Sequence, residues 1–371
     1  MSEQRARDLG IVIGEYPAGP ANAITDVAGV RVGHATLTAG TGELDSGRGP
    51  VRTGVTIIEP RSNVMSSPVF ANYHRLNGNG EMTGLHWVSE AGALTTPVGI
   101  TNTHSVGVVR DAIVSRLASQ RPDRDLYWLL PVVAETWDGI LNDINGQHVR
   151  SEHVNAAFDA LTTGAVDEGC VGGGTGMLCH EFNGGIGTSS RTLGLPDASY
   201  TLGVLVQANH GRRNRLRING VPVGEMIGYD EIPSPFEDAA ALAGSGSIIV
   251  VLATDAPLLP HQCERLARRA SLAIGRTGGT GEHSSGDLIL AFATGNSGLP
   301  EVGLETPGGR SEIPLKMASN PVLDSLFDMT IEATEEAIVN ALVAAETTVG
   351  RDGIVAHPLD HDRLRVALGL A

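Results

Sequence analysis

The chain has 371 residues, a formal net charge of −16, 41% hydrophobic and 4% aromatic residues. This acidic balance argues against nucleic-acid binding, because a phosphate backbone needs a basic face. The three cysteines, Cys170, Cys179 and Cys263, have no CxxC spacing and indicate neither a disulfide framework nor a thiolate metal site. We expect no metal and no cofactor.

The first sixteen residues, MSEQRARDLGIVIGEY, mix charges with apolar residues and lack the apolar core of a signal peptide. No run approaches the ~20 apolar residues of a membrane span. We therefore expect a cytoplasmic protein without a membrane partner.

The first part of the chain alternates between predicted strands and helices. Alternating apolar and polar residues between Gly and Pro are typical of strands, and apolar residues three or four apart are typical of helices. These patterns predict strands at 22–37, 51–60 and 199–209 and helices at 106–117 and 155–161. An apolar run at 126–135 is interrupted by Pro131, and a glycine-dense segment follows at 168–193.

The segment 211–246 is rich in Arg, Pro, Glu and Asp with little periodicity, which indicates an exposed, cleavable linker. Strands at 247–254 and 287–294 follow, with a helix at 260–274 between them. The last helix is predicted with Asn320 as its cap, Pro321 in its first turn and Gly350 at its end. Strands and helices in this order fit sheets covered by helices, and a four-layer arrangement is consistent with them.

The junction Gly246-Ser247 lies where the linker meets an apolar strand. A serine there could be both the residue after a scissile bond and a nucleophile. If the bond is cut, Ser247 gains an α-amine with a pKa near ~7.7–8, which can take the hydroxyl proton without a histidine. The alternative is that Gly-Ser is ordinary turn punctuation before a strand.

The glycine-dense segment does not indicate a phosphate loop. Gly172, Gly173, Gly174 and Gly176 give no G-x-G-x-x-G between strand and helix, and no GK[ST] follows. Close approach of backbones at tight turns is the favoured interpretation. His180-Glu181 are adjacent in sequence, which is a poor geometry for joint metal ligation.

Four further polar residues lie at the edges of apolar strands. Glu135 follows an apolar run and is either a structural carboxylate or an anchor for a cation. Asn209 ends a strand, where an amide can cap a turn or donate to an oxyanion. Ser285 and Asp287 open a strand as Ser247 does, so the three lie side by side if the two strands pair.

In these contexts the chain resembles the DmpA-type aminopeptidases, self-cleaving enzymes that include the L-aminopeptidase/D-amidase/D-esterases and the β-peptidyl aminopeptidases. The resemblance runs through most of the chain, in GPANAITDVAGVRVGH, GVTIIEP, PVVAETWDGILND, VGGGTGM, GGIGTSSR, VLVQANHGRR, GSIIVVLATDAPL, SSGDLILAFATGN and NALVAAETTVGRDG.

The resemblance implies one domain, 1–371, with an α+β fold: a four-layer α-β-β-α sandwich similar to that of ornithine acetyltransferases. It implies a cut between Gly246 and Ser247, giving chains 1–246 and 247–371 that stay together and form a homo-oligomer of four such pairs. The implied substrate is a small peptide or amino-acid amide.

The resemblance also implies roles for single residues. Ser247 is the nucleophile, and Ser285 and Asp287 manage its proton. Asn209 stabilises the oxyanion, and Glu135 holds the ammonium group of the first residue of the substrate, which explains aminopeptidase behaviour.

Two positions depart from the family pattern. The family often has glutamate where Asp287 stands, and the shorter side chain reaches less far. Trp137 stands where the α-aminopeptidases have tyrosine, and is more similar to the β-peptidyl branch. We therefore expect a β-peptidyl aminopeptidase.

Several alternatives remain. One is an L-aminopeptidase/D-amidase/D-esterase that acts on α-amino substrates. An ornithine acetyltransferase-like acyltransferase or a nylon-oligomer amidase would tend to have threonine at the cut. A scaffold without turnover would stay one intact chain.

Overall fold

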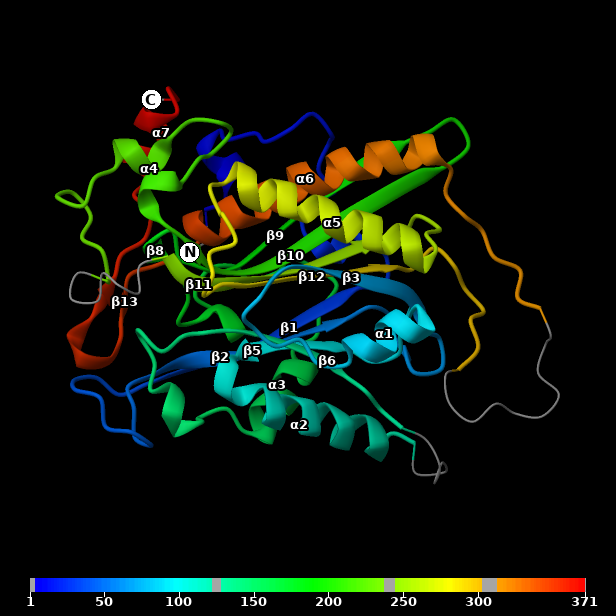
Figure 1. Ribbon diagram of the computed structural model, residues 1–371, viewed down its shortest axis with the longest axis horizontal. Coiled ribbons are helices and arrows are strands. Elements are labelled where there is room, and N and C mark those ends of the chain that lie inside the picture. Colours follow the sequence, from blue (N-terminus) through cyan, green and yellow to red (C-terminus); the bar gives the residue numbers. More distant parts are fainter. Residues whose placement is uncertain (1–3, 122–127, 237–243, 302–311, 371) are drawn as a thin grey trace.

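The computed structural model describes residues 4–121, 128–236, 244–301 and 312–370, and these form four layers (Figure 1). Helices α5 (Pro260–Arg276) and α6 (Asn320–Val343) cover a six-stranded sheet. A four-stranded sheet packs on its other face and is covered in turn by α2 (Val106–Ser119) and α3 (Ser151–Asp159). The predicted α+β class and four-layer α-β-β-α sandwich are confirmed.

The six-stranded sheet has the order β4-β3-β12-β11-β10-β9, and its two central strands, β11 and β12, run parallel. The remaining neighbours pair antiparallel. Its strands are β3 (Val69–Gly78), β4 (Ala93–Leu94), β9 (Gly185–Gly194), β10 (Ser199–Gly211), β11 (Gly244–Thr254) and β12 (Gly286–Ala293).

The second sheet has the order β1-β2-β5-β6. Its strands are β1 (Arg31–Ala39), β2 (Val51–Glu59), β5 (Val98–Asn102) and β6 (Val132–Thr136). The smaller elements are helices α1 (Leu85–Ala91), α4 (Val223–Met226) and α7 (His361–Ala367), and two hairpins, β7 (Leu178–Cys179) with β8 (Phe182–Asn183) and β13 (Thr348–Val349) with β14 (Val355–Ala356).

Strand β11 is buried on both faces, which explains its continuous apolar sequence. Ile248 and Val250 belong to the core beneath α5 and α6, whereas Ile249 and Val251 belong to the core between the two sheets. A third apolar cluster fills the space under α2 and α3. A strand covered on both sides needs no polar face, so its pattern shows no alternation.

The three consecutive glycines of the glycine-dense segment lie in a close-packed turn, as the sequence predicted. Gly172–Gly174 form one turn of 3-10 helix. A Cβ on Gly173 would stand 2.2 Å from Oε1 of Gln207, and one on Gly174 would stand 2.5 Å from the backbone nitrogen of Ile186. Larger residues do not fit there.

Two predicted elements have different bounds. The strand expected at 22–37 begins only at Arg31, because Ile24–Asp26 form a 3-10 turn. The Asp26 carboxylate accepts the backbone N–H groups of Ala21 and Ala23 and closes that turn. The helix expected at 155–161 is α3, which already begins at Ser151.

The expectation of an exposed linker at 211–246 is met only in part by the residues that the structure describes, and residues 237–243 lie outside them. Leu216, Ile218 and Val223 are fully buried in the core shared with α6. Arg213 is also fully buried, and its guanidinium lies 4.1 Å from the Phe182 ring. The segment therefore combines a buried apolar and Arg213 anchor with polar residues that are exposed, among them Asn214, Arg215 and Glu231.

The last helix also differs from its prediction. Its N-cap is Ser319, and Asn320 is already helical. The helix ends at Val343, and Thr348 and Val349 form strand β13 before Gly350 is reached. Apolar spacing continues beyond the helix because Ala344 and Ala345 are buried as well.

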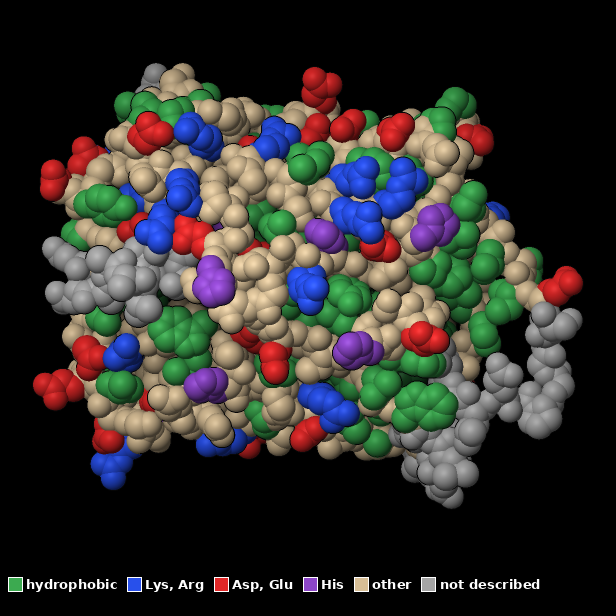
Figure 2. Space-filling view, in the orientation of Figure 1, with side chains coloured by type: hydrophobic (Ala, Val, Ile, Leu, Met, Phe, Trp, Pro, Cys, Tyr) green, Lys and Arg blue, Asp and Glu red, His purple; other side chains and the backbone are tan. Residues whose placement is uncertain are grey.

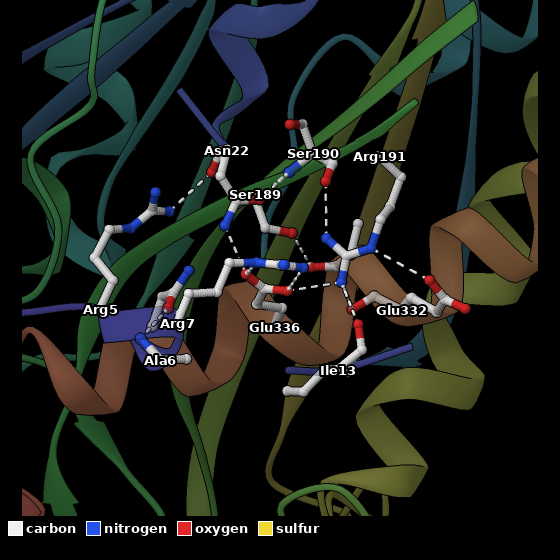
Figure 3. Close-up of polar contacts among 12 residues, drawn as sticks. Arg5, Ala6, Arg7, Ile13, Asn22, Ser189, Ser190, Arg191, Glu332 and Glu336 are labelled. Carbon is white, nitrogen blue, oxygen red and sulfur yellow. Dashed lines mark hydrogen bonds and ion pairs between the residues drawn. The ribbon is translucent and has the colours of Figure 1, made fainter. Parts of the chain in front are cut away.

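A buried cluster of charges ties the amino-terminal segment to α6 (Figure 3). Arg191 of β9 is fully buried, and its guanidinium lies 2.7 Å from Glu336 and 3.2 Å from Glu332. Arg7 reaches the same Glu336 carboxylate at 2.8 Å, and Asn22 donates to it. Burial alone would raise the pKa of Glu336, but the two arginines and Asn22 hold it below its usual value.

On the face seen in Figure 2, acidic and basic side chains are interspersed, with a group of basic side chains over α5. The net negative charge is therefore not gathered in one patch of this face. No helix within the described residues is long and apolar enough to cross a membrane.

The charge cluster predicts a stability difference between two arginines. Replacing Arg191 by Met leaves part of the Glu336 charge buried without a partner, and we expect a loss of about 3 kcal/mol in the free energy of unfolding. Arg217→Met is the control, because its ion pair with Glu225 is half exposed and should contribute at most about 1 kcal/mol. Urea denaturation measures both, and equal losses would contradict the role given to the cluster.

Candidate active site

The predicted site residues meet at one end of the central strands. Ser247 of β11 pairs with Asn209 of β10 on one side and with Gly286 of β12 on the other. Directly paired residues point to the same face of a sheet, so the side chains of Asn209 and Ser247 are neighbours. The sequence prediction depended on pairing between the strand that begins at Ser247 and the strand that follows Ser285. This pairing, of β11 with β12, is confirmed.

The Gly246-Ser247 junction lies in a β-bulge. Between the pairs Asn209 with Ser247 and Gly211 with Gly244, β10 supplies one residue and β11 supplies two. A bulge interrupts the hydrogen-bond ladder and bends the strand. A Cβ on Gly246 would stand 1.9 Å from the carbonyl oxygen of Asn209, so the bulge requires glycine before the serine.

The Ser247 hydroxyl is nearly buried, and its Oγ accepts the backbone N–H of Gly286 at 3.0 Å. The Ser285 hydroxyl donates to Oδ1 of Asp287 at 2.6 Å. Within the described residues, no hydrogen bond joins Ser247 to Ser285. Gly286, which lies between Ser285 and Asp287, pairs with Ser247, so the Ser285–Asp287 pair flanks Ser247 on the neighbouring strand.

Asp287 is almost fully buried, and this burial raises its pKa to about 6, against the lowering effect of hydrogen bonds from Ser285 and from the backbone of Ile248. Its Oδ2 has no hydrogen-bond partner among the described residues. The aspartate reaches Ser285 despite being shorter than the glutamate common in the family. The serine is held close because its carbonyl accepts the Asn77 amide at 2.6 Å.

Asn209 is held rigidly beside Ser247. Its Oδ1 accepts the backbone N–H of Leu178 at 2.7 Å, and its Nδ2 donates to the carbonyl of Trp137 at 2.9 Å. An amide carries two N–H groups, so one remains for another acceptor.

Glu135 is the last residue but one of strand β6 and is 3% exposed. Its Oε1 accepts the backbone N–H of Glu81 at 2.8 Å, and its Oε2 accepts the Thr103 hydroxyl. Burial raises the pKa of Glu135, and these two hydrogen bonds offset part of the rise. Within the described residues Glu135 forms no salt bridge.

One pocket of about 600 Å³ brings Ser247 and Glu135 together. Gly246 and Trp137 line it as well, whereas Asn209, Ser285 and Asp287 adjoin Ser247 without being among its lining residues. The lining residues are Asn79, Gly80, Glu81, Thr103, Glu135, Trp137, Gly246, Ser247 and Ser284. The pocket can therefore place a cationic group against one wall and a carbonyl against a serine on another.

Sequence reasoning missed the segment 77–81, NGNGE. Asn77 donates to the carbonyls of Glu282 and Ser285, and Asn79 donates to that of Ser284, so the segment holds the loop before β12. A Cβ on Gly80 would stand 3.0 Å from Glu135. Alternating Asn and Gly after an apolar strand was the available signal.

Two buried histidines lie behind the junction. The backbone N–H of His180 donates to the carbonyl of His210 at 2.7 Å, and burial lowers the pKa of His180 to about 4. Burial also lowers the pKa of His210 well below its usual value, so both imidazoles are neutral at pH 7. Within the described ranges, no group of three or more His, Cys, Asp and Glu is arranged to hold a metal ion.

Comparison with known proteins gives a consistent result. The model of peptidase family S58 matches residues 22–356. The β-peptidyl aminopeptidase BapA of Sphingosinicella microcystinivorans is 48% identical over 98% of this chain and 91% of its own length. A solved β-aminopeptidase from Burkholderia sp. superposes with a TM-score of 0.91 and 53% identity, covering 99% of this chain and 98% of its own. The solved L-aminopeptidase D-Ala-esterase/amidase of Ochrobactrum anthropi, described as a variant of the Ntn hydrolase fold, superposes with a TM-score of 0.89. It is 45% identical, with 98% of each chain covered.

The raised pKa of Asp287 predicts a pH-dependent stability difference. Its carboxyl group stabilises the fold fully below its unfolded pKa of about 4, and this contribution is lost as the pH rises through about 6. Asp287→Asn does not titrate. We therefore expect the free energy of unfolding of this variant, relative to the unchanged chain, to increase by up to about 3 kcal/mol between pH 4 and pH 7.5.

Urea denaturation at the two pH values measures this difference. Asp111→Asn, on the exposed surface of α2, is the matched control and should show no such change. A constant difference for Asp287→Asn would show that its carboxyl group is not perturbed by burial.

Proposed function

This chain belongs to peptidase family S58 and is an aminopeptidase, and we propose that Ser247 cuts the chain from its neighbour Gly246 and then serves as the nucleophile. The observation that carries the proposal is the shared pocket, in which a serine at a bulged Gly-Ser junction faces a buried carboxylate without a cationic partner. The single domain 1–371 then becomes two chains, 1–246 and 247–371.

Maturation begins with attack of the Ser247 hydroxyl on the carbonyl carbon of Gly246. The C–N bond breaks as the C–O bond forms, and the nitrogen of Ser247 receives the hydroxyl proton. Water hydrolyses the resulting ester to a Gly246 carboxylate and a free Ser247 hydroxyl. The bulge supports this step because the junction is not locked into a regular ladder.

Turnover uses the same hydroxyl on the amide carbonyl that follows the first residue of the substrate. The α-amine of Ser247, with the Ser285–Asp287 pair nearby, takes the hydroxyl proton and returns it to the leaving amine. The free N–H of Asn209 supports the role of oxyanion donor. Water then releases the first residue from the acyl-enzyme.

The buried Glu135 explains why the substrate must begin with a free amine. A terminal ammonium group would supply the missing counter-charge and make charge-assisted hydrogen bonds to the carboxylate. A chain that continues past this point would bring an uncharged amide against a buried carboxylate.

β-Amino-acid amides and β-peptides are the proposed substrates. Two of the three relatives described above are named for β-aminopeptidase activity, and Trp137 in the pocket wall resembles that branch. The serine at the cut disfavours the acyltransferase and nylon-oligomer amidase alternatives, which tend to have threonine.

Self-association and location are part of the same proposal. After the cut, the buried cluster keeps the pieces together, because Arg7 and Arg191 belong to the first chain and Glu336 to the second. A homo-oligomer of four cleaved pairs is proposed from the resemblance to the self-cleaving aminopeptidases. A cytoplasmic location stays a prediction from the sequence.

The proposed cut predicts two masses. The uncut chain has 371 residues and a mass of 38.6 kDa. In proportion to length, the cut should give a fragment 1–246 of about 26 kDa and a fragment 247–371 of about 13 kDa. Ser247→Ala should remain a single inactive chain, whereas Ser245→Ala, one residue before Gly246, should still be cut. Denaturing intact-mass spectrometry decides. A cut Ser247→Ala chain would remove Ser247 from the mechanism.

The substrate proposal predicts a preference for β-amino acids that depends on Trp137. We expect a higher kcat/KM for β3-homoalanine p-nitroanilide than for alanine p-nitroanilide, and Trp137→Tyr should reduce the ratio by about tenfold, the scale of small changes in pocket shape. Trp87→Tyr, a tryptophan that does not line the pocket, is the control. A preference for alanine in the unchanged enzyme would favour the α-amino alternative.

A further inference from the structure

The pocket holds a second carboxylate, that of Glu81, beside the proposed ammonium anchor. Segment 81–83 runs antiparallel to the end of β6, with Met82 bridged to Ala134 and the N–H of Thr83 donated to Val133. Continuing this register places Glu81 directly opposite Glu135. The backbone N–H of Glu81 confirms the proximity, since it donates to Glu135 Oε1 at 2.8 Å.

This arrangement puts like charges face to face. Residues directly opposite on antiparallel segments have Cβ atoms about 4.5–5.5 Å apart, and like charges there are destabilising. The charge of Glu81 accordingly raises the pKa of Glu135. The pair therefore opposes the stability of the empty protein.

The protein supplies no strong counter-charge to this pair. The lining of the pocket contains two glutamates and neither Lys nor Arg. Within the described residues Glu81 and Glu135 form no salt bridge, and the effect of His104 on the pKa of Glu135 is smaller than that of the Glu81 charge. One terminal ammonium neutralises only one of the two carboxylates.

We propose, on the basis of the proposed function, that Glu81 is a specificity residue. It selects substrates whose first residue carries a second cation on its side chain. The buried Glu135 binds the terminal ammonium. Glu81, which is exposed at the pocket rim, binds an amino group at the end of the side chain of that residue. The preferred substrates are thus amides and peptides that begin with a diamino acid.

The size of the preference follows from the exposure of Glu81. An exposed charge pair contributes up to about fivefold in affinity, and salt screens it because the Debye length falls from about 10 Å at 0.1 M to about 3 Å at 1 M. The effect should appear in KM, since both charges are present before and during the reaction.

The test compares the p-nitroanilides of β3-homolysine and β3-homonorleucine, whose side chains have the same number of carbons and differ by one ammonium group. At pH 8 and low salt, we expect the unchanged enzyme to favour the homolysine substrate about fivefold in kcat/KM through a lower KM. Glu81→Gln should bring the ratio close to one, as should 1 M NaCl. Glu90→Gln, which removes an exposed carboxylate outside the pocket lining, should leave the ratio unchanged.

The outcomes separate this inference from the proposed function. Equal hydrolysis of both substrates by the unchanged enzyme, or a ratio that Glu81→Gln leaves intact, overturns the role of Glu81 while Ser247 chemistry stands. If Glu135→Gln has no effect on either substrate, the proposed ammonium anchor is wrong. If neither substrate is hydrolysed by a correctly cut enzyme, the β-amino proposal and the role of Glu81 both fail.

Discussion

The position of Ser247 depends on the burial of β11 on both faces. With apolar cores above and below, this strand has little freedom to slide, because a slip by one residue would exchange its two faces. Its neighbours then fix what surrounds the serine: Asn209 on one side and the Gly286 N–H on the other. The apolar packing of β11 thus fixes the positions of the polar groups around Ser247.

The protein treats buried charge in two opposite ways. Glu336 lies among arginines that neutralise it, and its pKa stays low. Glu135 is buried, its donors among the described residues are a hydroxyl and a backbone N–H, and its pKa rises. The first arrangement stabilises the fold. The second leaves a buried carboxylate in a pocket without a salt bridge to any described residue. That contrast distinguishes a structural carboxylate from one kept ready for a ligand.

The sequence predicts much of this fold because its central strands are apolar runs bounded by polar residues, as at Ser247 and Asp287. It fails where long-range contacts override composition. Arg213 belongs to a segment that looked exposed, yet it is fully buried against Phe182. The candidate site follows the same division: Ser247 and Glu135 were predicted, whereas the local pattern of Asn and Gly at 77–81 does not show that Asn77 contacts Ser285 or that Glu81 lies opposite Glu135.

The bulge at the junction has a consequence for the order of events in biosynthesis. It exists only once β10 and β11 have paired, since the mismatch of one residue against two is a property of the pair. An unfolded or misregistered chain has no bulge and presents Gly246-Ser247 as an ordinary peptide bond. On the proposed mechanism, processing therefore acts as a checkpoint: the chain acquires its nucleophilic amine only after the central sheet has assembled, and an immature molecule cannot hydrolyse peptides around it.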